Sequence, residues 1–111
     1  FDKKRLRNID IIKNLRYSMK IGVGSVVLSK AGRDKGRYFV VVEVVDDNYV
    51  RISDGELRLQ ERAKLKKVKH LKFSGEVLPK ITEKLENGKQ VFDAELRSAL
   101  RTYNTTSKEE Q

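Results

Sequence analysis

Two apolar segments joined by a short basic turn constrain this chain more than any other feature. The segments, residues 26–29 and 38–45, are rich in β-branched and aromatic side chains, which favour strands. The turn between them, residues 30–37, contains Gly32 and Gly36, and glycine adopts a positive φ without a steric penalty. The pattern therefore predicts a hairpin with a tight, glycine-dependent loop.

The loop of this predicted hairpin is strongly basic. It contains one acid, Asp34, and four cations, Lys30, Arg33, Lys35 and Arg37. With so little acid beside them, these cations have no evident partner inside the protein. We therefore expect the tip to face solvent and to contact an anion, the alternative being a solvated loop without a function.

The second segment of the hairpin is apolar on both faces of a strand. One face carries Tyr38, Val40, Val42 and Val44, and the other carries Phe39, Val41, Glu43 and Val45. A strand of this kind is covered on both sides, as in the centre of a sheet or in a small barrel.

Two further turns follow the hairpin. Residues 46–48, Asp-Asp-Asn, predict a turn because these side chains hydrogen-bond their own backbone. The next strand, residues 49–53, is expected to direct Val50 and Ile52 inward and Tyr49, Arg51 and Ser53 outward.

Asp54-Gly55 is typical of a type I′ hairpin turn. We expect a returning strand after it, with Leu57 and Leu59 facing inward. Residues 62–73 show no clean alternation, so a bulge or a short helical turn is expected before a final short strand.

The loop sequence Gly32-Arg33-Asp34-Lys35-Gly36-Arg37, between two apolar strands, closely resembles the KOW motif. The resemblance continues through residues 40–48 and Asp54-Gly55 and covers residues 21–73. Within the KOW family it is greatest to the large-subunit ribosomal protein numbered fourteen of archaea and eukaryotes, and to small bacterial RNA-binding relatives. The resemblance implies RNA binding in a ribosomal context, and it implies no catalytic residue.

The predicted fold class is mainly β, with three parts. Residues 21–73 are expected to form a small SH3-like (KOW) β-barrel, since five short strands with glycine turns suit a closed meander. Residues 1–20 form a basic N-terminal extension, with seven cations against two acids. Its apolar residues recur every three or four positions, so it is either a cationic amphipathic helix or a disordered arm.

Residues 74–111 are expected to be a helical tail. Pro79 in a first turn and Gly88 beyond the end predict a helix between them. Asp93 is expected to cap a second helix over residues 94–103, followed by a frayed end. Its apolar stripe is expected to pack on the barrel or on the other helix rather than dock a partner; it comprises Leu96, Ala99, Leu100 and Tyr103.

The charge balance points to a polyanionic partner. The chain has a formal net charge of +9, from 25 basic and 16 acidic residues, which favours nucleic acid first and an acidic membrane second. No segment approaches the about 20 apolar residues that cross a bilayer. There is no cysteine, which excludes disulfides and cysteine metal sites. We therefore expect a cytoplasmic monomer without a membrane partner.

A second basic segment follows the third strand. Residues 62–73 contain six lysines or arginines and no acid. Together with the hairpin loop they define the predicted RNA-binding surface, whose lysines and arginines would neutralise phosphates while its aromatic rings stack on bases. The predicted residues are Lys30, Arg33, Lys35, Gly36, Arg37, Tyr49, Arg51, Arg58, Arg62, Lys64, Lys66, Lys67, Lys69, His70 and Lys72.

Other functional classes fit less well. His70 has no nucleophile or acid in a catalytic pattern, so we expect no enzyme and no cofactor. The aspartates at residues 46, 47 and 54 are explained by turns, so no metal site is expected. The alternative is a KOW protein-interaction module of the transcription or translation machinery. That alternative predicts a neutral apolar surface, whereas residues 21–73 hold 12 basic and 7 acidic residues.

Overall fold

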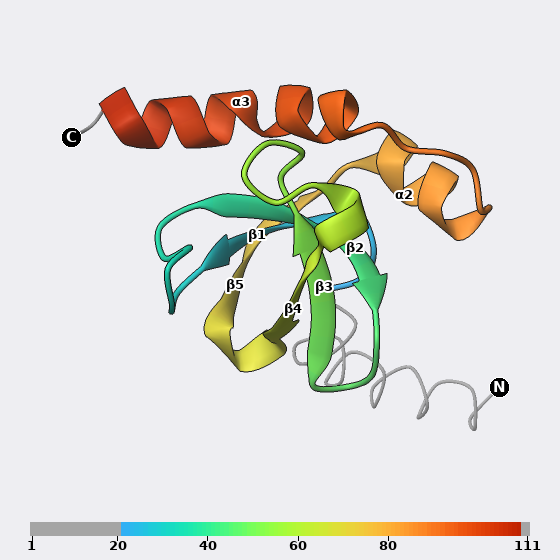
Figure 1. The fold of residues 1–111 in the computed structure, drawn as a ribbon, viewed down its shortest axis with the longest axis horizontal. Coiled ribbons are helices and arrows are strands. Elements are labelled where there is room, and N and C mark those ends of the chain that lie inside the picture. Colours follow the sequence, from blue (N-terminus) through green and yellow to red (C-terminus); the bar gives the residue numbers. More distant parts are fainter. Residues whose placement is uncertain (1–20, 110–111) are drawn as a thin grey trace, which may run out of the picture.

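The computed structural model describes residues 21–109 and shows a curved five-stranded antiparallel sheet with two helices packed on one side (Figure 1). The strand order is β4-β3-β2-β1-β5, which leaves β4 and β5 at the edges. The prediction of a mainly β protein agrees with this architecture. The elements are β1 (Ser25–Ser29), β2 (Tyr38–Val44), β3 (Tyr49–Ser53), the 3-10 helix η2 (Gln60–Arg62), β4 (Lys64–Lys67), the 3-10 helix η3 (Val68–His70), β5 (Leu71–Val77), α2 (Pro79–Glu86) and α3 (Asp93–Glu109).

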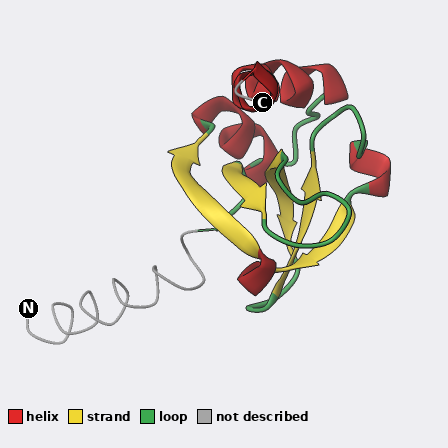
Figure 2. Ribbon diagram, turned by 90° about the vertical axis from the view of Figure 1, so that its left-hand side faces the viewer, coloured by secondary structure: helices red, strands yellow, loops and turns green. Residues whose placement is uncertain are grey.

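β2 is buried on both faces over residues 39–41, as its sequence predicts, and β1 is buried on both faces at Val26 and Val27. Phe39 and Val41 of β2 point into one hydrophobic cluster with Val50 and Ile52 of β3. The opposite face of β1 and β2 forms a second cluster under the helices, which lie together on that side in Figure 2. Its fully buried members are Val26, Val40, Leu96 and Leu100.

The loop between β1 and β2 is closed at its base by backbone hydrogen bonds. The Ser29 N–H donates to the Arg37 carbonyl at 3.0 Å, and the Gly36 N–H donates to the Ser29 carbonyl at 2.9 Å. Gly32 has φ of 82° and Gly36 of 92°, where a side chain would be strained. The predicted glycine-dependent loop is confirmed.

The turn between β2 and β3 also follows its prediction. The Asp46 carboxylate accepts hydrogen bonds from the N–H groups of Asn48 and Tyr49, both at 2.8 Å. β3 spans residues 49–53 as expected, with Val50 and Ile52 buried. Ser53, which was expected to face outward, is instead buried, and its hydroxyl donates to the Arg58 carbonyl.

The predicted type I′ hairpin at Asp54-Gly55 is wrong. A type I′ turn needs a positive φ at both central residues, and in the described part of the chain only glycines have one. The Asp54 carboxylate instead accepts from the Arg58 N–H at 2.8 Å and organises a wider loop. Leu57 and Leu59, expected to face inward, are 62% and 38% exposed.

The strand that returns to β3 is β4, which begins at Lys64, later in the chain than the returning strand expected directly after Asp54-Gly55. The expected short helical turn is present as η3, directly before β5. β5 extends to Val77, beyond the expected boundary at residue 73, because it continues to pair with β1 past a bulge. The sheet and the tail therefore share this strand.

The helices belong to the same core as the sheet. Pro79 occupies the first turn of α2, as predicted. The apolar stripe of α3 packs on the sheet with Ala99 and Tyr103, which confirms packing on the strands. Lys84 of α2 donates to Glu95 of α3 at 2.7 Å, and this hydrogen bond holds the pKa of Glu95 below its usual range.

Two details of α3 differ from prediction. Asp93 was expected to cap the helix, but its carboxylate accepts from the backbone N–H of Gln60 at 2.9 Å. The carboxylate of Glu95 accepts the Phe92 N–H instead. The helix also continues to Glu109, past the expected end at residue 103.

Within residues 21–109, no helix is both long enough and apolar enough to span a bilayer. The amphipathic helix or basic arm predicted for residues 1–20 lies outside the described residues.

Candidate nucleic-acid interface

A hollow of about 730 Å³ lies where the β2–β3 turn meets η3 and the start of β5. Four lysines line it, from the start of the β1–β2 loop, the end of β4, η3 and β5, and Asp47 is the one acid among its described lining residues. The remaining lining is aromatic, aliphatic or amide. The lining residues are Ile21, Lys30, Asp47, Asn48, Tyr49, Lys67, Val68, Lys69, Leu71, Lys72 and Phe73.

Backbone hydrogen bonds fix the walls of this hollow. The Lys30 N–H donates to the His70 carbonyl at 2.8 Å, which ties the basic loop to the end of η3. The Val68 N–H donates to the Asn48 carbonyl at 2.8 Å, which ties the start of η3 to the β2–β3 turn. The lysines therefore project from a scaffold whose backbone is held on both sides.

Tyr49 provides the aromatic wall of the hollow. It pairs with Lys67 across β3 and β4, and the Lys67 ammonium lies 6.0 Å from the centre of the tyrosine ring. This distance is at the outer limit of a cation–π contact. Tyr49 is half-buried, whereas Phe73 also packs against the hydrophobic cluster that contains Phe39. The tyrosine is thus the ring better placed for stacking on a ligand.

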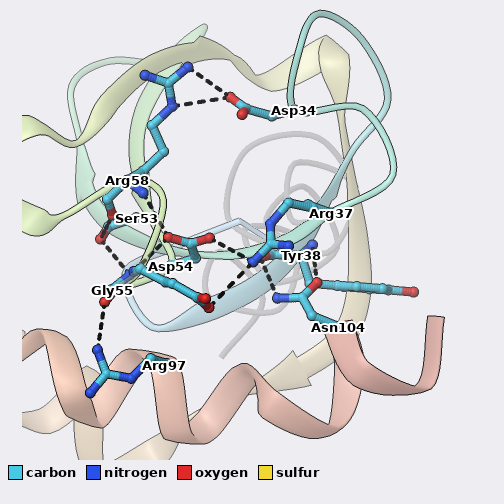
Figure 3. Close-up of polar contacts among 10 residues, drawn as sticks. Asp34, Arg37, Tyr38, Ser53, Asp54, Gly55, Arg58, Arg97 and Asn104 are labelled. Atoms are coloured by element: carbon cyan, nitrogen blue, oxygen red, sulfur yellow. Dashed lines mark hydrogen bonds and ion pairs between the residues drawn. The ribbon is translucent and has the colours of Figure 1, made fainter. Parts of the chain in front are cut away.

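Several predicted site residues are used inside the protein. Arg37 forms an ion pair with Asp54 at 3.0 Å, and the Asp54 side chain is 1% exposed. Arg58 and Lys64 form ion pairs with Asp34 at 3.3 and 3.6 Å (Figure 3 shows Arg58 with Asp34). The expectation that the basic tip has no partner within the protein is therefore wrong for Arg37, because an acid outside the loop reaches it.

Lys66 is also directed inward. Its ammonium donates to the Ala31 carbonyl at 2.8 Å, and the residue is 7% exposed. Burial, with a further contribution from the neighbouring Lys64 charge, lowers the pKa of Lys66. Its charge supports the loop from inside and does not line the hollow.

The other predicted residues lie around the hollow or away from it. Arg33, Lys35 and Gly36 are exposed at the loop tip. Arg62 is exposed in η2, and Arg51 is exposed beside Glu43 at 3.1 Å. His70 is half-buried and contributes its carbonyl to the Lys30 contact. The structure thus groups Lys30, Tyr49, Lys67, Lys69 and Lys72 in one site.

Six lining residues are not among the predicted RNA-binding residues: Ile21, Asp47, Asn48, Val68, Leu71 and Phe73. Asp47 and Asn48 were interpreted only as turn residues, and Val68 only as part of a basic run. The backbone hydrogen bond between Asn48 and Val68 brings the turn and η3 together, and no local sequence pattern predicts it.

Within the described residues, no cluster of three or more acidic or histidine side chains is arranged to hold a metal ion. Comparison with protein-family models finds no family that matches the chain.

Proposed function

We propose that this protein binds RNA through the lysine-lined hollow and the adjoining tip of the basic loop. The observation that carries the proposal is the convergence of four lysines from four separate segments on one hollow, which has a single acid among its described lining residues. Such a surface neutralises consecutive phosphates of a nucleic acid backbone.

The tyrosine in the hollow favours single-stranded or unpaired RNA as the ligand. Aromatic rings stack on bases that are free of a duplex, while nearby cations contact the backbone. Tyr49 and Lys67 lie together in this arrangement.

The biological setting that we propose comes from the resemblance of residues 32–37 to the KOW motif. We assign the curved sheet to the SH3-like barrels and place the protein with ribosomal RNA, as a ribosomal-protein-like or ribosome-associated component. It acts in the cytoplasm as a monomer, without a cofactor and without catalysis.

A salt titration of binding to ribosomal RNA fragments tests this function. Four lysine–phosphate contacts give a slope of log affinity against log salt of roughly −2.8 to −3.6. The double variant Lys69→Glu/Lys72→Glu should flatten the slope and weaken binding to all sequences. Its matched control is Lys80→Glu/Lys89→Glu, which changes two exposed lysines outside the hollow by the same charge. Equal losses in the two double variants would refute the assignment of the hollow.

A protein-interaction module is the second candidate function. Leu57 and Phe92 favour it, because their apolar side chains are 62% and 56% exposed. This function predicts that wild-type affinity for RNA is weak and insensitive to the charge of the hollow. The same titration therefore separates the two candidates.

A further inference from the structure

We propose that Asp34 is a positioning residue of the RNA interface, which holds the basic loop against the segment that carries the other cations. The inference rests on the proposed function of the hollow. Asp34 is the only acid in the loop of residues 30–37, and it is 7% exposed. An acid in an RNA-binding loop opposes binding unless it has a structural use.

One carboxylate oxygen of Asp34 meets two cations from different parts of the chain. Its Oδ2 atom lies 3.3 Å from Nη2 and 3.4 Å from Nε of Arg58, which belongs to the loop after β3. The same atom lies 3.6 Å from Nζ of Lys64, the first residue of β4. Figure 3 shows the Arg58 guanidinium directed at Asp34. The side chain thus connects three segments.

Sheet hydrogen bonds cannot make this connection. The loop joins β1 to β2, and β3 lies between β2 and β4 in the sheet. The loop reaches β4 through side chains, at Asp34 with Lys64 and at Ala31 with Lys66. Lys64 and Lys66 are two residues apart on one strand, so both point to the same face and secure the loop at two places.

The positioning role and simple electrostatics predict opposite changes in RNA affinity when the charge of Asp34 is removed. If Asp34 acts only as a charge, its removal reduces repulsion of phosphate and RNA binds more tightly. If it positions the loop, its removal frees Arg58 and Lys64 and makes the loop flexible. Binding must then order the loop at an entropic cost, and the affinity for RNA falls. The sign of one measurement therefore decides between them.

The test compares Asp34→Asn with Asp47→Asn in affinity for a single-stranded ribosomal RNA fragment at fixed salt. Asp47 is the matched control because it is exposed on the wall of the hollow, and the change removes the same charge. We expect Asp34→Asn to bind about three- to tenfold more weakly and Asp47→Asn to bind more tightly than wild type. Unchanged or tighter binding by Asp34→Asn would overturn the proposal.

A second variant, which leaves the net charge unchanged, tests the proposal in case Asp34→Asn does not fold. Arg58→Lys keeps the net charge but loses the two-nitrogen approach to Asp34, so it should also weaken RNA binding. Circular dichroism establishes that each variant is folded. If Asp34→Asn does not fold, wild-type affinity in Arg58→Lys overturns the proposal by itself.

Amide hydrogen exchange without RNA separates this inference from the proposed function. The Gly36 N–H bonds to the Ser29 carbonyl at the base of the loop and the Arg37 N–H bonds to the Asp34 carbonyl, and both should exchange faster in Asp34→Asn than in wild type. Unchanged exchange refutes the positioning role, whatever RNA does. If exchange is faster in Asp34→Asn but the wild type binds no RNA, the proposed function is refuted. Asp34 would then still position the loop, but for a function other than RNA binding.

Discussion

The side-chain amide of Asn104 forms hydrogen bonds with both backbone polar groups of Tyr38, a residue 66 positions earlier. The Tyr38 N–H donates to Oδ1 at 2.9 Å, and Nδ2 donates to the Tyr38 carbonyl at 3.4 Å. The rings of Tyr38 and Tyr103 are tilted against each other, with centroids 5.1 Å apart. α3 is therefore fastened to the residue that immediately follows the basic loop.

Asn104→Ala should lower the free energy of unfolding by about 1 kcal/mol, because the half-buried backbone groups of Tyr38 lose their partner. Urea denaturation measures this change. Thr102→Ala, an exposed position on the same helix, is the control and should stay near wild type. Indistinguishable midpoints for the two variants would show that the contact contributes no stability.

Gly55→Ala should destabilise the protein far more than Gly36→Ala. A Cβ at Gly55 would overlap the Asp93 carbonyl and lie 3.0 Å from the Arg97 nitrogen, both backbone atoms that cannot rotate away. A Cβ at Gly36 meets nothing within 4 Å, so only the strain of a positive φ remains, about 1 kcal/mol. Thermal melting of the pair measures the difference. Similar losses would mean that the loop moves easily away from α3.

Deleting residues 1–18 should leave the sheet and helices folded, since β1 begins at Ser25 and pairs with β2 on one side and with β5 on the other. The deletion removes six cations and two acids, so affinity for RNA should fall at low salt and recover relative to wild type as salt rises. Circular dichroism and RNA titration check the two parts. An unfolded truncated protein would show that the extension supplies part of the core.

Tyr49→Ala should reduce RNA affinity by about 1 to 3 kcal/mol with little change in salt slope, because a lost stacking contact releases no counterions. Tyr49→Phe keeps the ring and is the control. Fluorescence anisotropy with labelled RNA at several salt concentrations measures both quantities. A loss in the phenylalanine variant equal to that in alanine would assign the effect to the hydroxyl.

The first three strands could be predicted because local chemistry alone specifies them. A nearly continuous run of apolar residues defines β2, and the Asp46 carboxylate closes the turn before β3. Asp54-Gly55 has the same local chemistry, yet it begins a wide loop. There the outcome depends on distant partners, Arg37 for the carboxylate and the start of α3 against the glycine. A sequence motif does not contain those contacts.

The candidate site was predicted in composition but not in arrangement. Lys66 and Lys67 are neighbours in one basic run, and sequence offers no reason to separate them. On β4 they point to opposite faces, so Lys66 is buried against Ala31 while Lys67 lies over Tyr49 in the hollow. The register of β4, a strand predicted at the wrong residues, decides which lysine is available to a ligand.

The burial of β1 and β2 on both faces has a consequence for the order of events during synthesis. Val26 and Val40 emerge early from the ribosome, but Leu96 and Leu100, which cover them, are made more than 50 residues later. Until then the hairpin exposes an apolar valine surface to solvent, and a chain in this state is prone to aggregation. The nascent chain therefore needs α3 before the β1–β2 hairpin is protected from self-association.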